Sequence, residues 1–541
     1  MGSTAALPRM LKNSYVPRCA ISDWRVLPSV VKDPARTAAR GGSGLANIFD
    51  VFAGFKSPHA IAIKTDDGRQ LRFEDLDALS ARICGVFCDS GVRPGDRVAV
   101  QVKKSPEALA LYLACLRFGA IFVPMNTAYT ADEAAHIVED SDPALLVVDP
   151  GLAAASLQYD RCAFHTLEGR GGSLMQAAAD TTPMSPVYDA DADDPAAILY
   201  TSGTTGQPKG AVLSHRNLSS NAKTLAKAWR FTAEDTLLHA LPIFHAHGLF
   251  VASNVSFMAG CQQLLLDGFS VEGVLTHLPH ATVFMGVPTF YTRLLASPKF
   301  TRAVAEHMRL FTSGSAPLLP QTFKAFEDRA GSAILERYGM TETVMISSNL
   351  YDGPRIAGAV GPALADITIR IVGPDGAEVP PGETGDVEVK GPNVMTGYWR
   401  APDKTAQSFT NDGYFKTGDQ GYKDDAGYVF LVGRAKDMII SGGFNVYPIE
   451  IEQALNARPE IDESAVIGIA HADFGEAVTA VIVPRSGYDV DETALLSDLK
   501  TSLANYKVPK ALIERDTLPR NTMGKVRKEV LRDAYASYYS S

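Results

Sequence analysis

The segment from Tyr200 to Gly210 restricts the fold and chemistry of this chain more than any other. It reads Tyr-Thr-Ser-Gly-Thr-Thr-Gly-Gln-Pro-Lys-Gly and follows the apolar, strand-like run 196–199. Glycines let backbone N–H groups turn toward an anion, hydroxyls add neutral donors, and a lysine adds one positive charge. Lys209 lies between Pro208 and another glycine, whereas a Walker A loop ends in Gly-Lys-Ser/Thr. The segment predicts a nucleoside triphosphate site outside the P-loop NTPase fold, and a plain surface turn is the alternative.

Strand-like and helix-like periods alternate from Arg72 onward. The helix expected over 106–118, for example, begins with Ser105 as N-cap and Pro106 at its first position, and ends at Gly119. Strand, helix and strand at such lengths favour parallel pairing with helices on the sheet faces.

Later segments change character. Residues 367–389 alternate in short strands broken by Gly-Pro-Asp-Gly and Pro-Pro-Gly-Glu, which predicts an antiparallel subdomain. The tail from about residue 437 has its own strands and a helix over 493–505. We therefore expect an α/β protein with a large N-terminal domain of layered sheets and helices, an antiparallel subdomain, and a small α+β C-terminal domain.

Composition excludes several classes of protein. The 541 residues are 46% hydrophobic and 21% charged, as in globular proteins, and no apolar run approaches the roughly 18 residues that span a bilayer. The net charge of −10 argues against a general nucleic-acid surface. The six cysteines form no Cys-x-x-Cys pair, so we expect free thiols without zinc or a disulfide framework.

Residues 1–44 form a distinct basic leader, with seven lysines and arginines against two aspartates. Such a balance is typical of an organelle transit peptide, and an ordinary disordered arm is the alternative. The expected location is the mitochondrial matrix or, alternatively, the cytoplasm.

Four further segments carry groups suited to one nucleotide site. The run 337–342 combines an aromatic ring, a hydroxyl and a carboxylate able to hold Mg²⁺. The run 415–419 ends in an acid that could take ribose hydroxyls, and 433–437 holds Gly-Arg-Ala-Lys-Asp after a strand. The run 519–525 places Lys525 behind a glycine turn.

Together, the five motifs resemble those of the adenylate-forming superfamily of acyl-CoA synthetases, adenylation domains and luciferases, over about residues 45–535. The resemblance implies a large domain over 45–434 and a mobile lid domain over 435–541, with the hinge at Lys436. It also implies ATP and coenzyme A as substrates, Mg²⁺ as cofactor, and two half-reactions in two domain orientations.

The resemblance assigns roles to residues at matching positions. The implied phosphate loop consists of Thr201, Ser202, Gly203, Thr204, Thr205 and Lys209. The other implied nucleotide contacts are Tyr338 and the Ser313-Gly314-Ser315 turn at adenine, Thr341 at the α-phosphate, Glu342 at Mg²⁺, and Asp419 and Arg434 at the ribose. Lys525 would bridge carboxylate and phosphate oxygens during adenylation, and Gly442 and Gly443 would line the channel for coenzyme A.

Two segments bear on the acid. Residues 241–252, with His245 and His247, and residues 286–293, ending in Arg293, closely resemble malonyl-CoA synthetases. There the equivalent arginine binds the distal carboxylate of malonate or methylmalonate, and His245 would lie beside the reacting end. We expect Arg293 to be buried in the pocket wall, where a planar guanidinium pairs best with a carboxylate. An ion pair with Asp267 is the structural alternative.

Other readings remain open. The run 343–349 is less polar than expected for that group, which leaves the ranking of short diacids undecided. A ligase for short monocarboxylic or aryl acids is the main alternative, and a catalytically inactive nucleotide-binding protein is a third. A lysine acetyltransferase and deacylase acting on Lys525 would be possible regulatory partners, since acetylation removes the charge.

Overall fold

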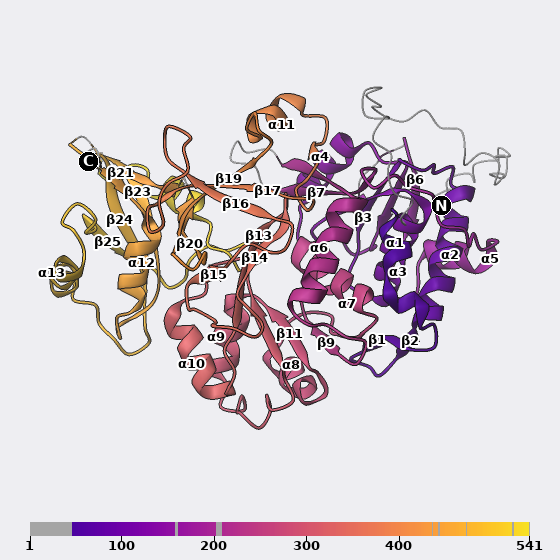
Figure 1. Cartoon of the computed structure of the whole chain (residues 1–541), viewed down its shortest axis with the longest axis horizontal. Helices are drawn as coiled ribbons and strands as arrows, with labels where there is room; N and C mark the ends of the chain where they lie inside the picture. Colours follow the sequence, from indigo (N-terminus) through magenta and orange to yellow (C-terminus); the bar gives the residue numbers. More distant parts are fainter. Residues whose placement is uncertain are drawn as a thin grey trace, which may run out of the picture.

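The computed structural model describes residues 46–156, 159, 161–201, 208–434, 437–441, 444–471, 473–521 and 524–539. Figure 1 shows two parallel-stranded sheets with their helices, an antiparallel sheet beside them, and a separate C-terminal unit at one side. The expected fold class is confirmed.

A seven-stranded sheet carries the phosphate loop. Its order is β18-β8-β7-β4-β3-β5-β6, and the strands from β7 to β6 are parallel. The strands are β3 (Arg97–Gln101), β4 (Ile121–Pro124), β5 (Leu145–Val148), β6 (Ala163–Thr166), β7 (Pro195–Thr201), β8 (Lys209–Ser214) and β18 (Gly397–Tyr398).

An eight-stranded sheet carries most of the segments that we expect to bind the acid. Its order is β14-β13-β12-β11-β9-β10-β1-β2, parallel except at the two edges. The strands are β1 (Ile61–Thr65), β2 (Gln70–Arg72), β9 (Thr236–His239), β10 (Gln262–Leu265), β11 (Val283–Gly286), β12 (Leu310–Ser313), β13 (Leu335–Met340) and β14 (Val344–Ser348).

Helices pack on both sheets, and one of them is buried all round. The main helices are α2 (Phe73–Asp89), α3 (Pro106–Phe118), α4 (Ala131–Ser141), α6 (His215–Ala228), α9 (Pro288–Ala296) and α10 (Pro320–Ala330). Ser105 accepts a hydrogen bond from the Ala108 N–H, and Gly119 ends α3 with φ of 78°, as the sequence predicts. Every residue of α3 is buried, because its apolar side chains pack against elements of both sheets.

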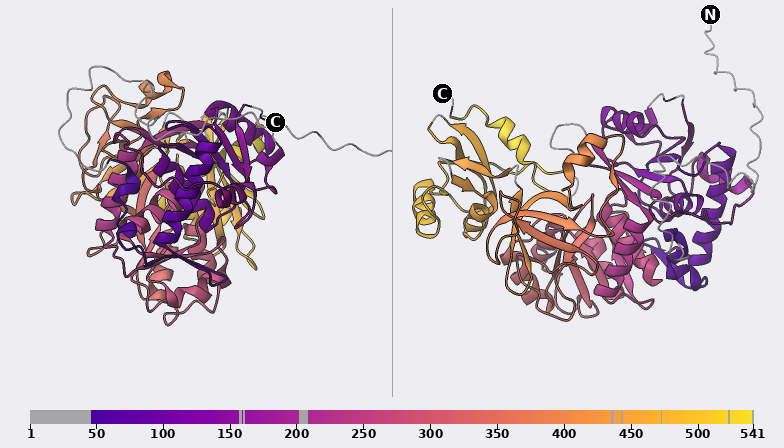
Figure 2. Two further views of the ribbon diagram at one scale, coloured as in Figure 1. Left: turned by 90° about the vertical axis from the view of Figure 1, so that its right-hand side faces the viewer. Right: turned by 45° about the horizontal axis from the view of Figure 1, so that its top comes forward.

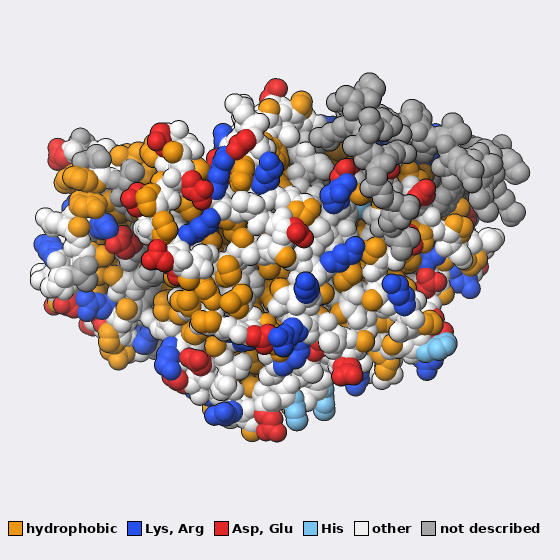
Figure 3. All heavy atoms as spheres, viewed as in Figure 1, with side chains coloured by type: hydrophobic (Ala, Val, Ile, Leu, Met, Phe, Trp, Pro, Cys, Tyr) orange, Lys and Arg blue, Asp and Glu red, His pale blue; other side chains and the backbone are white. Residues whose placement is uncertain are grey.

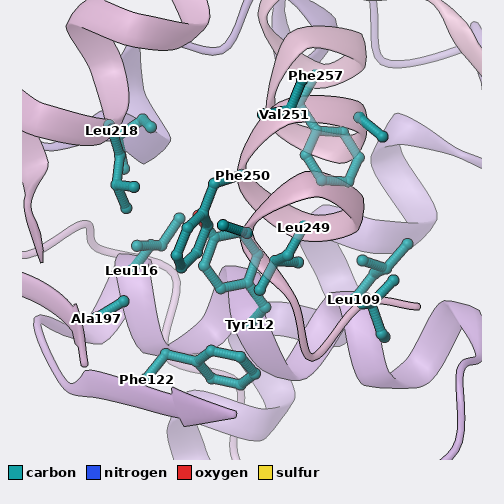
Figure 4. Close-up of a cluster of buried hydrophobic side chains, with 14 of the residues drawn as sticks. Leu109, Tyr112, Leu116, Phe122, Ala197, Leu218, Leu249, Phe250, Val251 and Phe257 are labelled. Atoms are coloured by element: carbon teal, nitrogen blue, oxygen red, sulfur yellow. The ribbon is translucent and has the colours of Figure 1, made fainter. Parts of the chain in front are cut away.

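Figure 4 shows how α3 meets the segment that follows β9. Leu109 and Tyr112 lie against Leu249 and Phe250, which belong to a π-helical stretch over His247–Ser253. The Tyr112 hydroxyl donates to Asn254 Oδ1 at 3.1 Å. This hydrogen bond ties Asn254, which directly follows the π-helical stretch, to the buried helix α3.

Two smaller sheets complete the chain. The antiparallel sheet has the order β15-β20-β19-β17-β16, with β15 (Ala359–Gly361), β16 (Thr368–Val372), β17 (Gly385–Lys390), β19 (Phe415–Lys423) and β20 (Val429–Arg434). The C-terminal sheet has β21 (Ile439–Ser441), β22 (Phe444–Val446), β23 (Ile461–His471), β24 (Gly475–Pro484) and β25 (Ala511–Glu514). Its helices are α12 (Pro448–Asn456), α13 (Glu492–Ser502) and α14 (Lys528–Ala534). Figure 2 shows this unit standing beside the large domain.

The surface is mixed in charge. On the face seen in Figure 3, acidic and basic side chains are interspersed rather than gathered into a field of one sign. Among the described residues, no helix is long and apolar enough to cross a membrane.

Candidate active site

The ends of the phosphate loop are held by a β-hairpin. Thr201 at the end of β7 pairs with Lys209 at the start of β8. Lys209 Nζ lies 5.4 Å from the centre of the Tyr398 ring, a favourable cation–π distance. Ser202, Gly203, Thr204 and Thr205 lie outside the described residues.

Glu342 and Thr341 lie in the turn between β13 and β14. Glu342 is 7% exposed and accepts a hydrogen bond from the Tyr398 hydroxyl at 3.0 Å. Burial raises the pKa of its carboxyl, although the Tyr398 hydrogen bond and Arg434 act against the shift. Val344, at the end of this turn, has φ of 55°, which a β-branched residue rarely adopts. The backbone of this turn is therefore strained at Val344, two residues after Glu342.

Tyr338, Asp419 and Arg434 form one connected group. The Tyr338 hydroxyl donates to Asp419, and Arg434 Nε lies 3.0 Å from Asp419 Oδ1. Asp419 and Arg434 are opposite one another in the β19–β20 ladder, which fixes their pairing. The structure thus brings three of the implied nucleotide contacts together.

His245 and His247 lie beside the Ser313-Gly314-Ser315 turn. His247 Nδ1 is 3.2 Å from Ser315 Oγ, and the His247 N–H donates to His245 Nδ1 at 3.3 Å. Burial, and next the Arg337 charge, lower the pKa of His245 to about 4. Burial and Arg337 also lower the pKa of His247 well below its usual value. Both imidazoles are therefore neutral at pH 7.

Arg337 on β13 is the site residue that the sequence analysis missed. It is 4% exposed, and its Nε and Nη2 atoms are buried without a hydrogen-bond acceptor among the described residues. Burial lowers the pKa of its guanidinium to about 10, so it is still charged at pH 7. A Cβ at Gly314 would lie 2.0 Å from Arg337 Nη1, so glycine permits this close approach. Its signal in the sequence was an arginine that directly follows an apolar run and a glutamate, in the segment leading to Tyr338.

Arg293 lies elsewhere. It is exposed on α9, so the expectation of a buried arginine was wrong. It forms no ion pair with any described residue, which also removes the pairing with Asp267. Its charge acts on Arg520 of the C-terminal domain, where burial and then Arg293 lower the pKa of the Arg520 guanidinium.

The loop that carries Lys525 contacts the start of α9. A Cβ at Gly524 would lie 2.9 Å from Thr289 Oγ1, and Gly524 has φ of 73°. The Lys525 N–H donates to Asn521 Oδ1 at 3.0 Å, which closes the turn. Lys525 thus lies next to the helix that borders the acid-binding segments. Lys436, Gly442 and Gly443 lie outside the described residues.

Comparisons with known proteins identify the family of the chain. The family model of the AMP-binding enzymes matches residues 53–399, and that of their C-terminal domain matches residues 450–525. The chain is 37% identical to a feruloyl-CoA synthase of an Amycolatopsis species over 483 residues, covering 88% of this chain and 96% of that protein. It is 34% identical to a malonate–CoA ligase of Arabidopsis thaliana over 524 residues, covering 87% and 86%.

A solved structure extends the match. ATP-bound MatB from Rhodopseudomonas palustris is 50% identical, with a TM-score of 0.88, covering 92% of this chain and all of that one. The apo form of the same protein superposes with a TM-score of 0.78. The chain belongs to the AMP-binding family and is an AMP-forming acid–CoA ligase.

Proposed function

We propose that this ligase joins a short dicarboxylic acid, malonate or methylmalonate, to coenzyme A through an acyl-adenylate. Arg337 carries the proposal. Its guanidinium is buried and charged, and two of its N–H-bearing atoms have no acceptor among the described residues. A buried cation without an anion is costly, whereas a carboxylate that accepts two N–H bonds compensates it.

The surroundings of Arg337 fit the distal carboxylate of a small diacid. His245 and His247 are neutral, so each can donate one ring N–H without adding a charge of its own. Ser313 Oγ and His247 Nε2 are also buried without a partner among the described residues. A second carboxylate on the acid would satisfy several of these groups at once. Arg293, which is exposed on α9, remains a proposed contact at the rim of the acid site.

The reacting carboxylate would lie between Lys525 and the α-phosphate of ATP. Attack of a carboxylate on a phosphate brings two anions together, so preorganised positive charge lowers the barrier. Thr341, Tyr338, Asp419 and Arg434 would orient the nucleotide, and the hairpin ends Thr201 and Lys209 would hold the leaving pyrophosphate.

Mg²⁺ fits Glu342. This carboxylate is buried, and no lysine or arginine of the described residues forms an ion pair with it. The described residues offer no group of three or more metal-ligating side chains. One carboxylate together with substrate phosphates is a common way of binding Mg²⁺. When bound, the ion would neutralise charge on the phosphates.

A ligase for short monocarboxylic or aryl acids is the second candidate, favoured by the 37% identity to the feruloyl-CoA synthase. Such an acid would leave the Arg337 guanidinium without an anion. The two candidates therefore differ in what Arg337 binds.

ATP–pyrophosphate exchange with malonate, methylmalonate, acetate, butyrate and benzoate separates them. We expect malonate or methylmalonate to stimulate exchange most, and Arg337→Met to lower that exchange by about 100-fold, because losing one partner of a buried charge pair costs about 2–5 kcal/mol. Exchange with butyrate should persist or rise. Arg293→Ala, at an exposed position, should cost about tenfold or less. Diacids that stimulate exchange no better than acetate, or an Arg337→Met variant that loses butyrate and malonate activity equally, would exclude the diacid reading.

A further inference from the structure

A cavity of about 650 Å³ lies at the carboxyl ends of β3, β5 and β10, apart from the groups described above. Its wall includes Lys103 and Lys104 after β3, Asp149 after β5, and the segment Pro242–Phe244. That segment directly precedes His245 in the chain. The cavity wall is thus adjacent in the chain to a residue of the proposed acid-binding region.

Lys104 is held in this wall by two acceptors from one residue. Its Nζ donates to the His239 carbonyl oxygen at 2.6 Å and lies 3.2 Å from His239 Nδ1. His239 Nε2 lies 2.9 Å from the Gly248 carbonyl oxygen, which can only accept. Nε2 must therefore carry the proton and Nδ1 must accept. Two N–H bonds of Lys104 are thus occupied, and its side chain is part of the cavity wall.

The acids that line the cavity with Lys104 are mostly engaged with other cations. Arg69 pairs with Glu107 at 2.6 Å, Lys103 with Asp149 at 3.4 Å and Arg170 with Asp67 at 3.5 Å, while Asp66 binds His277. No carboxylate of the described residues forms an ion pair with Lys104; Asp267 acts on it only through space.

Burial without a counter-ion disfavours the ammonium form. It lowers the pKa of Lys104 well below its usual value, and Asp267 offsets the shift only in part. A neutral amine keeps its lone pair and is a nucleophile, as in enzymes that use desolvated lysines. The nearby Lys103 side chain is 64% exposed and paired with Asp149, so it is a matched comparison for Lys104 within the same stretch of chain.

We propose that Lys104 is a self-acylation site of this ligase, modified by acyl thioesters of coenzyme A such as its own product. The lone pair of Nζ attacks the thioester carbonyl, the C–N bond forms as the C–S bond breaks, and coenzyme A leaves as the thiol with the amine proton. The product is an amide in the cavity wall that is stable to hydrolysis. The proposal rests on acid–CoA ligation alone and not on which acid is used.

The test incubates the full chain with preformed acetyl-CoA or malonyl-CoA and follows acylation by mass spectrometry. Cleavage with a glutamyl endopeptidase leaves Lys103 and Lys104 in one peptide, so the two are compared directly. At about pH 7, Lys104 should be acylated at least about tenfold faster than Lys103, because an ordinary lysine is almost fully protonated there. From about pH 7 to 9 the rate at Lys104 should rise less steeply than the roughly tenfold per pH unit of an ordinary lysine.

Two controls isolate the folded environment. In denaturant the two lysines should react at equal rates, since their local sequences are alike. Lys104→Arg should abolish labelling at this position and leave Lys103 unchanged. Equal labelling of both lysines in the native chain, or a rate at Lys104 that rises tenfold per pH unit, would overturn the proposal. Because the acyl-CoA is supplied preformed, neither result depends on the proposed dicarboxylate activity.

Discussion

At the scale of single residues, replacing Lys525 should affect the two half-reactions differently. Replacing it with alanine removes the charge expected between carboxylate and phosphate, so adenylation should slow by about 100- to 1,000-fold, as when one preorganised donor is lost elsewhere. Thioester formation from preformed acyl-adenylate should be largely retained. Rapid-quench measurement of each half-reaction provides the comparison, and an equal loss in both would contradict the assigned role.

Glu336 gives a prediction about pH. Burial raises the pKa of its carboxyl from 4.5 to about 8, and its Oε1 accepts from the Gly358 N–H at 2.8 Å. Between these values the folded chain keeps a proton that the unfolded chain has released, so the free energy of unfolding falls as pH rises from about 5 to 8. Glu336→Gln keeps the acceptor and cannot ionise. Between about pH 5 and 8, the free energy of unfolding of the variant should therefore fall by about 3 kcal/mol less than that of the unmodified chain.

Chemical denaturation at several pH values measures this difference. Glu378→Gln is a matched control, because Glu378 is exposed and shows no such burial. A Glu336→Gln curve parallel to that of the unmodified chain would show that Glu336 is ionised in the folded state.

Among the helices and strands, those whose ends are marked by residues of their own segment could be predicted from the sequence. The cap residues Ser105 and Pro106 define α3 because they satisfy backbone groups within one turn. The π-helical stretch from His247 has no such signal, since its hydrogen bonds follow from packing. It depends on Gly248, where a Cβ would lie 2.0 Å from the Pro242 carbonyl oxygen. Sequence order alone could not show that this tight contact places His247 beside Ser315.

The two arginines proposed to meet the acid show the same limit. A nine-residue helix such as α9 has an inner and an outer face, and the sequence did not show that Arg293 is on the outer one. Arg337 lies in a strand whose preceding residues are buried, so its burial follows from sheet position. The order of the motifs predicted which segments lie together. The direction in which each side chain points became known only from the structure, because it depends on how the helices and strands pack.

On the scale of the whole molecule, the position of the C-terminal domain bears on which half-reaction this arrangement can perform. The Lys525 loop touches α9, and the chain superposes better on ATP-bound MatB than on its apo form. This arrangement fits the adenylation step. Transfer to coenzyme A should need the domain to rotate about the proposed hinge at Lys436.

A reversible crosslink tests that requirement. A Cβ at Gly524 would lie 3.6 Å from Thr289 Cβ, within the range of about 3.5–4.5 Å for disulfides. The double variant Thr289→Cys, Gly524→Cys, once oxidised, should retain ATP–pyrophosphate exchange and lose acyl transfer to coenzyme A, and reduction should restore transfer. The Thr289→Cys single variant controls for oxidation, and the reduced double variant controls for strain at the positive φ of Gly524. Full thioester formation by the crosslinked chain would mean that both half-reactions proceed in this one arrangement, because a closed disulfide prevents the rotation.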